Sequence, residues 1–183
     1  MSYRGFIGMT LLSLLGITCI DQAPEPDVAR EIPERQFIMH NAKITEYRDG
    51  AVKWSSLAQQ ATGDLRETEV ETTTSYFPSN KGEIYRLVSP TGVVRLEERN
   101  ALFNNVVVYD ERGGTLNAGV VVYEEQTQLL RASGPLEYRA AGVSLNGQQG
   151  QIDLQSEEVA IIGPVHGSIH PDVFKKARQA QLP

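Results

Sequence analysis

Short apolar runs follow one another along residues 93–169, with turn-forming residues between them and no 3.6-residue helical period. The runs are rich in β-branched and aromatic side chains, which favour a pleated sheet. The intervening glycine, asparagine and proline residues accept positive φ or end a strand. The pattern therefore predicts a ladder of β-strands. The runs are Val93–Leu96, Val106–Tyr109, Val120–Tyr123, Leu136–Tyr138, Ile152–Leu154 and Val159–Ile162.

The same kind of pattern extends upstream of residue 93. Phe37–Met39 and Ala42–Tyr47 predict a first strand, and Glu67–Phe77 alternates acidic with apolar or hydroxyl side chains, so one face of that strand contacts water. Trp54, the only tryptophan, is expected in the core, and Leu57–Gly63 is compatible with both strand and turn. The expected turns lie at residues 48–50, 89–92, 113–114, 141–142, 146–147, 150 and 163–164.

Four segments are predicted along the chain. Residues 1–20 form a signal or membrane anchor, and residues 21–35 form a polar linker, because three prolines and seven charges leave too little apolar area to order it. Residues 36–170 form an all-β domain. Residues 171–183 form a short helix or tail, in which Pro171 suits the first helical position.

The N-terminal segment has the plan of an export signal, with a basic head, an apolar stretch and a polar continuation. As a helix, residues 6–20 would reach about 22 Å, less than the roughly 30 Å of a bilayer core. Leu14–Cys19 resembles a bacterial lipoprotein box, although Thr18 is larger than the usual residue before the cysteine. Three alternatives stay open: a lipid on Cys19, a short anchor helix held by Arg4, or a cleaved signal.

The charge of the chain argues against a nucleic-acid partner. The formal net charge is -6 at pH 7, and no basic stripe is available to neutralise a row of phosphates. An anionic ligand would therefore have to be held by its apolar part.

The sequence contains no recognisable set of catalytic residues. The imidazoles are limited to His40, His166 and His170, and Pro171 interrupts any helix that would join the last two into a metal site with Asp172. The paired acids at 97–98, 124–125 and 157–158 are adjacent, so neighbours point to opposite faces of a strand and are expected to be solvent-side charges. We expect no enzyme activity, no metal site and no cofactor.

The chain resembles the LptC family, the periplasmic, membrane-anchored subunit of the bacterial lipopolysaccharide-export machine. The resemblance covers about residues 37–169 and rests on the order of several short motifs behind the N-terminal segment. That segment is shorter than the usual anchor helix of the family. The motifs are Thr45–Trp54 for the opening hairpin, Asn104–Val108, Gly114–Ala118 and Val121–Tyr123 for central rungs, and Pro135–Leu136, Val143–Gly147 and Ile161–Gly167 for closing rungs.

The resemblance implies an open, V-shaped β-jelly roll on the periplasmic side of the inner membrane of a Gram-negative bacterium. Such a subunit receives lipopolysaccharide from an inner-membrane ABC transporter and passes it to a periplasmic bridge protein of the jelly-roll type, as part of outer-membrane biogenesis. Strand pairing at the open ends and an apolar groove between the sheets would agree with this role.

Two sets of residues are expected to carry this function. The partner-binding edge comprises Val159, Ile161, Gly163 and Val165, the last strong strand run before the tail. The lipid-binding set consists of alternate residues in the runs, which point to one face of a strand. It comprises Trp54, Leu96, Val106, Val108, Leu116, Val121, Tyr123, Leu136, Leu145, Ile152 and Leu154.

An alternative from another class is a structural or adhesive β-sandwich lipoprotein of the envelope, without lipid cargo. Its interior would be dry and filled. The sequence leaves this alternative open, because the lining of a groove and an ordinary core have the same composition.

Overall fold

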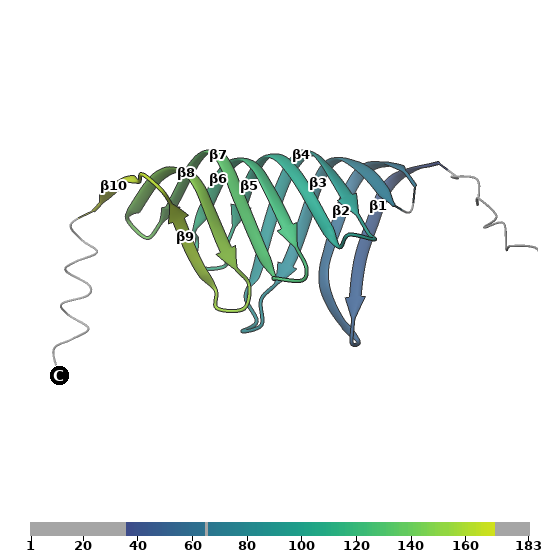
Figure 1. Ribbon diagram of the computed structural model, residues 1–183, viewed down its shortest axis with the longest axis horizontal. Coiled ribbons are helices and arrows are strands. Elements are labelled where there is room, and N and C mark those ends of the chain that lie inside the picture. The colour runs from purple at the N-terminus through teal and green to yellow at the C-terminus, as the bar shows by residue number, and fades with distance from the viewer. Residues whose placement is uncertain (1–35, 65, 171–183) are drawn as a thin grey trace, which may run out of the picture. The chain divides into compact units, whose positions relative to one another are not determined.

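The computed structural model describes residues 36–64 and 66–170, which form ten β-strands in one antiparallel sheet. Strands that are consecutive in the chain are neighbours in the sheet, and β9 and β10 pair one after the other along β8 (Figure 1). The strands are β1 (Phe37–Arg48), β2 (Ala51–Gly63), β3 (Glu67–Pro78), β4 (Ile84–Arg95), β5 (Asn100–Tyr109), β6 (Thr115–Glu124), β7 (Leu129–Ala140), β8 (Val143–Asp153), β9 (Glu158–Ile162) and β10 (His166–Ile169).

These ranges contain no helix of the length and apolar character needed to cross a membrane. The predicted signal or anchor, the linker, Cys19 and the C-terminal helix lie outside the described residues. The predicted all-β class with an open antiparallel sandwich is confirmed.

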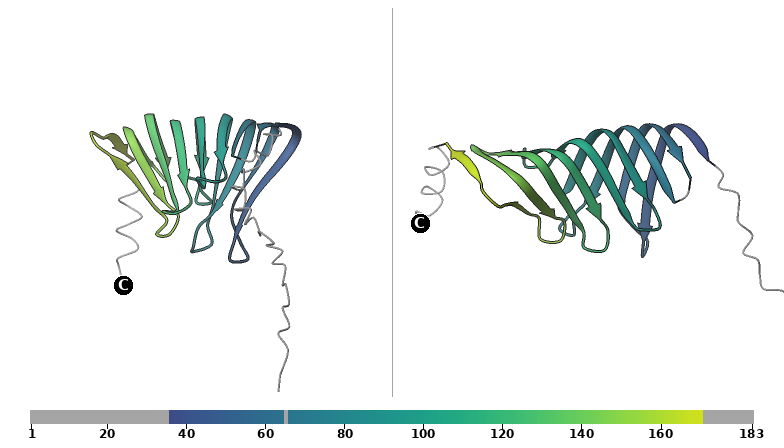
Figure 2. Two further views of the ribbon diagram at one scale, coloured as in Figure 1. Left: turned by 45° about the vertical axis from the view of Figure 1, so that its right-hand side comes forward. Right: turned by 45° about the horizontal axis from the view of Figure 1, so that its top comes forward.

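The long strands bend over near their middle along one line that crosses the sheet (Figure 2). On this line, odd-numbered strands carry left-handed residues, namely Asn41, Thr72, Asn105 and Gly134, and Gly163 does so between β9 and β10. Asparagine and glycine tolerate this conformation, whereas it is uncommon for threonine. The fold line consists of Asn41, Gln59, Thr72, Pro90, Asn105, Gly119, Gly134, Gln148 and Gly163.

The inward-facing positions shift by one residue at the fold line. In β5, Ala101 and Phe103 are buried before the line, and Val106 and Val108 are buried after it. A single alternation therefore does not run through the strand, and one long strand has the sequence pattern of two short ones.

This shift explains the turn predictions that are wrong. Ser89–Gly92 lies inside β4, which continues through exposed Pro90, and Asn146-Gly147 and Gly150 lie inside β8. Leu57–Gly63 is strand throughout. The turns predicted at residues 48–50, 113–114 and 141–142 are confirmed.

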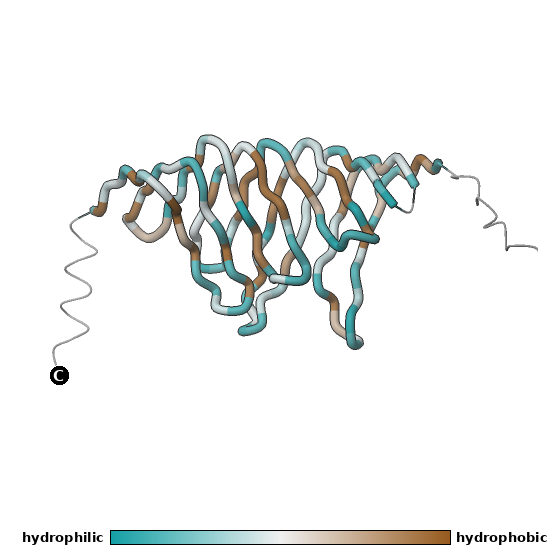
Figure 3. The backbone as a smooth tube through the Cα atoms, viewed as in Figure 1, coloured by the Kyte–Doolittle hydropathy of each residue, from teal (hydrophilic) through white to brown (hydrophobic). Residues whose placement is uncertain are grey.

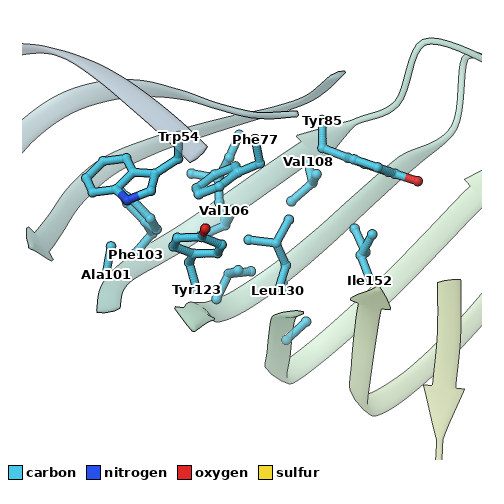
Figure 4. Packing of buried hydrophobic residues seen from close by; sticks show 14 of the residues in the cluster. Trp54, Phe77, Tyr85, Ala101, Phe103, Val106, Val108, Tyr123, Leu130 and Ile152 are labelled. Atoms are coloured by element: carbon cyan, nitrogen blue, oxygen red, sulfur yellow. The ribbon is translucent and has the colours of Figure 1, made fainter. Parts of the chain in front are cut away.

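The core lies between the two halves of the folded sheet. Apolar stretches concentrate in the strands, and polar residues concentrate in the turns (Figure 3). Phe77 lies at the centre of an aromatic cluster, with ring centroids 4.7 Å from Tyr123, 6.3 Å from Phe103 and 6.3 Å from Trp54. Side chains from strands on both sides of the fold line thus point toward one another (Figure 4).

Candidate functional site

The interior of the folded sheet is the candidate lipid-binding site, and most of the predicted lining residues point into it. All of them except Leu96 and Leu145 are buried. They come from β2, β5, β6, β7 and β8 and from the turn after β8, so the apolar interior extends across much of the sheet. Lipid binding by these buried residues stays a prediction.

Leu96 does not line the interior. β4 ends at Arg95, and Leu96 lies in the following turn with 41% of its surface exposed. Leu145 is half-buried on β8 and pairs with Gly167 of the edge strand β10. The predicted run Val93–Leu96 extends one residue beyond the end of β4. Continuing the strand alternation over this extra residue placed Leu96 on the inner face.

The sequence interpretation missed several large buried side chains. Phe103 and Val106 are both buried although they are three positions apart, because the fold line at Asn105 lies between them. Phe103 therefore does not belong to the alternating run that begins at Val106. Phe77 faces inward together with Thr73 and Ser75, because the inward-facing positions of β3 shift by one residue at Thr72. An unbroken alternation from Val70 would have placed Phe77 on the outer face. The missed residues are Phe77, Tyr85, Leu87, Phe103 and Leu130.

The interior is filled by its own side chains, which corrects the expectation of an open groove. Phe77 and Phe103 are 0% exposed, and Trp54 is 2% exposed. A hollow of about 530 Å³ lies beside the β7–β8 turn and is lined by residues such as Arg139, Ser144 and His170. Its lining includes no member of the aromatic cluster. An apolar ligand can therefore reach the interior only if the surrounding strands or turns move apart.

The hairpin turns form two rims, and contacts between the rims close the folded sheet along a line that we call the seam. Asn80 in the β3–β4 turn donates its backbone N–H to the carbonyl of Leu154 in the β8–β9 turn, at 2.9 Å. One rim carries the turns at 49–50, 79–83, 110–114 and 141–142. The other rim carries the turns at 96–99, 125–128 and 154–157 and the end of β2 at Gly63.

The first latch across the seam consists of Arg48, Arg99 and Glu125. Arg48 Nη1 lies 2.5 Å from Glu125 Oε1, which joins the β1–β2 turn to the β6–β7 turn. Arg99 Nη1 lies 3.9 Å from Glu125 Oε2. The Glu125 side chain is 0% exposed, so the expectation that this acid is a solvent-side charge is wrong. A buried carboxylate requires such a cationic partner.

The second latch consists of Ser79, Glu83, Arg112 and Glu157. The Arg112 guanidinium pairs with Glu83 on its own rim and lies 3.2 Å from Glu157 Oε2 on the other rim. The Ser79 hydroxyl donates to Glu157 Oε1 at 2.5 Å. Arg112 holds the pKa of Glu83 below its usual range, whereas burial raises the pKa of the neighbouring Tyr85 hydroxyl. Glu157 is thus also a seam residue, and the expectation of a purely solvent-side charge is wrong for it.

Acid is expected to weaken this latch. Because the pKa of Glu83 is lower in the folded chain than in the unfolded one, its stabilising contribution is complete above about pH 4.5 and is lost as the pH falls through the folded value. The pKa values of Asp64 and Asp153 are also lowered, by backbone hydrogen bonds, so they add to the same trend.

Melting temperatures between pH 7 and pH 3 measure this effect. The wild type should lose more stability on acidification than Glu83→Gln, which has no proton to gain at this position. Equal losses in the two proteins would contradict the assignment.

The two edges of the sheet are β1 and the β9–β10 segment. In the described ranges, β1 pairs only with β2. Of the predicted partner-binding residues, Val159 and Ile161 on β9 are half-buried against the core, whereas Gly163 and Val165 are exposed. Large exposed apolar side chains occur at both edges, with Ile38, Met39, Tyr47, Val52 and Leu57 on β1 and β2 and Ile162, Val165 and Ile169 at the other edge.

Metal-ligating residues do not gather anywhere in the described ranges: no group of three or more histidine, cysteine or acidic side chains is placed to hold an ion. The described residues thus form an apolar interior under a charged seam, between the two edges of the sheet.

Comparison with known proteins gives a structural likeness. No protein-family model matches the chain, and no curated protein matches it. Among solved structures, it is similar to LptH, the LptA-homologous periplasmic component of the conserved lipopolysaccharide transport device of Pseudomonas aeruginosa. The TM-score is 0.32 and the sequence identity is 10%, over 75% of this chain and 96% of that chain.

Proposed function

We propose that this protein is a lipopolysaccharide-binding and transfer subunit of the bacterial envelope, and not an enzyme. The observation that carries the proposal is the continuous apolar interior of the folded sheet, between two edges whose outer backbone groups face away from the sheet. An acyl chain needs an apolar lining of this kind, and a relay of modules needs unpaired edges through which one module continues into the next.

A carrier of this kind has to release its cargo. Burying a dozen methylene groups of one acyl chain would contribute on the order of 10 kcal/mol, at about 0.8 kcal/mol per group. An empty preformed cavity would therefore hold a lipid with several chains very tightly. An interior that first has to separate its own side chains binds less tightly, which favours transfer between modules.

A proposal for the place of the protein in the envelope is supported by its N-terminal segment, whose sequence pattern is that of an export signal or anchor. We propose that it stays attached to the inner membrane on the periplasmic side, as an LptC-type subunit. There it would receive lipopolysaccharide from an ABC transporter complex and pass it to a periplasmic jelly-roll bridge protein. Mass spectrometry of the mature N-terminus would show whether Cys19 carries a lipid.

Photocrosslinking tests the proposed lipid binding. A photoreactive residue at Val108 or Leu136, both buried in the interior, is expected to form an adduct with lipopolysaccharide in cells. The same residue at Val107, whose side chain alternates with Val108 and points to the outer face, is the matched control. The proposal fails if no interior position gives an adduct, or if positions 107 and 108 label equally.

A structural β-sandwich without lipid cargo is the second candidate, and the filled interior with its latched seam favours it. Such a protein would bind neither lipopolysaccharide nor an apolar fluorescent probe. Binding of the probe at concentrations that leave the circular dichroism spectrum unchanged would exclude this candidate.

A further inference from the structure

The proposed function requires that an acyl chain reach the interior. The structure described above blocks this access. The aromatic cluster is buried, and the turns above it are joined across the seam by the two latches. An acyl chain that enters from the side must therefore part the rims at one of these places.

The two latches differ in how firmly they hold the rims. The second latch is reinforced by the backbone hydrogen bond from Asn80 to Leu154 and by Lys81, whose Nζ lies 2.7 Å from the carbonyl oxygen of Ser156. At the first latch, the contact across the seam is the ion pair between Arg48 and Glu125. The rims should separate more readily there, because fewer bonds have to break.

The hairpin that carries Arg48 lies at one edge of the sheet. It joins β1 to β2, and β1 is an edge strand with a partner on one side in the described ranges. Tyr47 and Val52 pair next to the turn, and they are 68% and 39% exposed. Outward movement of this hairpin separates Trp54 from Phe77 and Tyr123, and it presents an exposed apolar pair at the point of access.

The first latch lies close in sequence to Trp54 and Tyr123 of the aromatic cluster. Glu125 follows Tyr123 by two residues, and Trp54 lies on the strand that begins at the β1–β2 turn. The Trp54 and Tyr123 rings are 6.2 Å apart, and the Trp54 indole N–H donates to Glu46 Oε2 at 2.6 Å. Opening this latch would uncover both rings.

We propose that the Arg48–Glu125 ion pair is the latch of a lateral gate, through which an acyl chain of the lipid cargo reaches the interior beside Trp54 and Tyr123. The inference rests on the proposed lipid binding. When the β1–β2 hairpin moves outward, water reaches Glu125, so the open state does not leave a buried charge unpaired.

The test uses the full chain in phospholipid vesicles, with Trp54 as the reporter because it is the only tryptophan. Arg48→Gln removes the cation, and Glu125→Gln removes the buried charge while keeping the shape of the side chain. Arg95→Gln is the matched control, because Arg95 pairs with Glu67 at 2.7 Å on the same rim, so this ion pair does not cross the seam. The readouts are quenching of Trp54 by acrylamide and the rate of its quenching by an added brominated fatty acid.

Both latch variants are expected to raise the rate of quenching by the brominated fatty acid by at least about tenfold, because removing one partner of an ion pair with a buried carboxylate strongly destabilises the closed state. They should also make Trp54 more accessible to acrylamide. Arg95→Gln should behave as the wild type.

Unchanged quenching in Glu125→Gln, with the far-UV spectrum preserved, overturns the gate. If lipopolysaccharide labels Val108 while the latch variants behave as the wild type, lipid binding stands and the gate is wrong. If the variants expose Trp54 and the fatty acid never quenches it, the gate as an acyl-chain route is overturned together with lipid binding.

Discussion

Phe77→Ala should destabilise the protein by about 3–5 kcal/mol, the cost of removing a fully buried phenylalanine side chain. The Phe77 ring is 0% exposed and contacts the aromatic rings of Tyr123, Phe103 and Trp54. Its loss would remove contacts between the two halves of the sheet and leave a cavity between them. Urea unfolding followed by circular dichroism measures the change in the free energy of unfolding.

Tyr76→Ala is the control for this prediction. Tyr76 is the preceding residue on β3, and its half-buried side chain points to the outer face. Its removal should cost much less than the removal of Phe77. If Phe77→Ala lost less than about 1 kcal/mol, within the range of surface substitutions, the interior would not be packed as described.

Gly163→Asp should abolish co-purification with a jelly-roll bridge protein. Gly163 is exposed between β9 and β10, at the edge where we propose that the partner strand pairs. A carboxylate there would have to be buried or displaced when the partner strand joins, and charges at sheet edges prevent such pairing. We expect the affinity to fall by more than about tenfold, which corresponds to about 1.4 kcal/mol.

Gly113→Asp is the matched control, because it adds the same charge in the β5–β6 turn, outside the β9–β10 segment. The two glycines have similar backbone conformations, with φ of 94° at Gly163 and 86° at Gly113, and an added Cβ meets no atom within 4 Å at either position. The two variants should therefore share the cost of backbone strain. Binding that survives in Gly163→Asp would show that the partner uses another surface.

Local side-chain patterns were sufficient to predict the fold class and most of the buried lining. Within a half-strand such as residues 106–109, alternate valines point inward, and the sequence displays this directly. The first hairpin was also predictable, because Asp49 and Gly50 adopt the positive φ values that such a turn requires.

The fold line could not be predicted in the same way. Pro90 and Gly147 are usually signs of a strand end, and here they lie where strands cross the bend or directly beside it. The change of phase at the bend hides the continuity of each strand. A left-handed residue at Asn105, followed by a new alternation, was the available signal, and asparagine alone does not distinguish a bend from a turn.

The latches were beyond sequence reasoning for a different reason. Arg48 and Glu125 are 77 positions apart, and they meet only because the sheet folds over and brings the two rims together. The neighbouring acids Glu124 and Glu125 have the same local chemistry, yet one is partly exposed and the other is buried. Their difference is set by the tertiary structure.

The central claim is that acyl chains of lipopolysaccharide lie against the interior face of the sheet. The most direct measurement is of intermolecular nuclear Overhauser effects between the acyl methylene protons and methyl groups of the protein. The account predicts effects to the interior methyl groups of Val106, Val108 and Leu136, and none to Val107 on the outer face. Saturating lipopolysaccharide that gives no interior effects, or equal effects to Val107 and Val108, would contradict it.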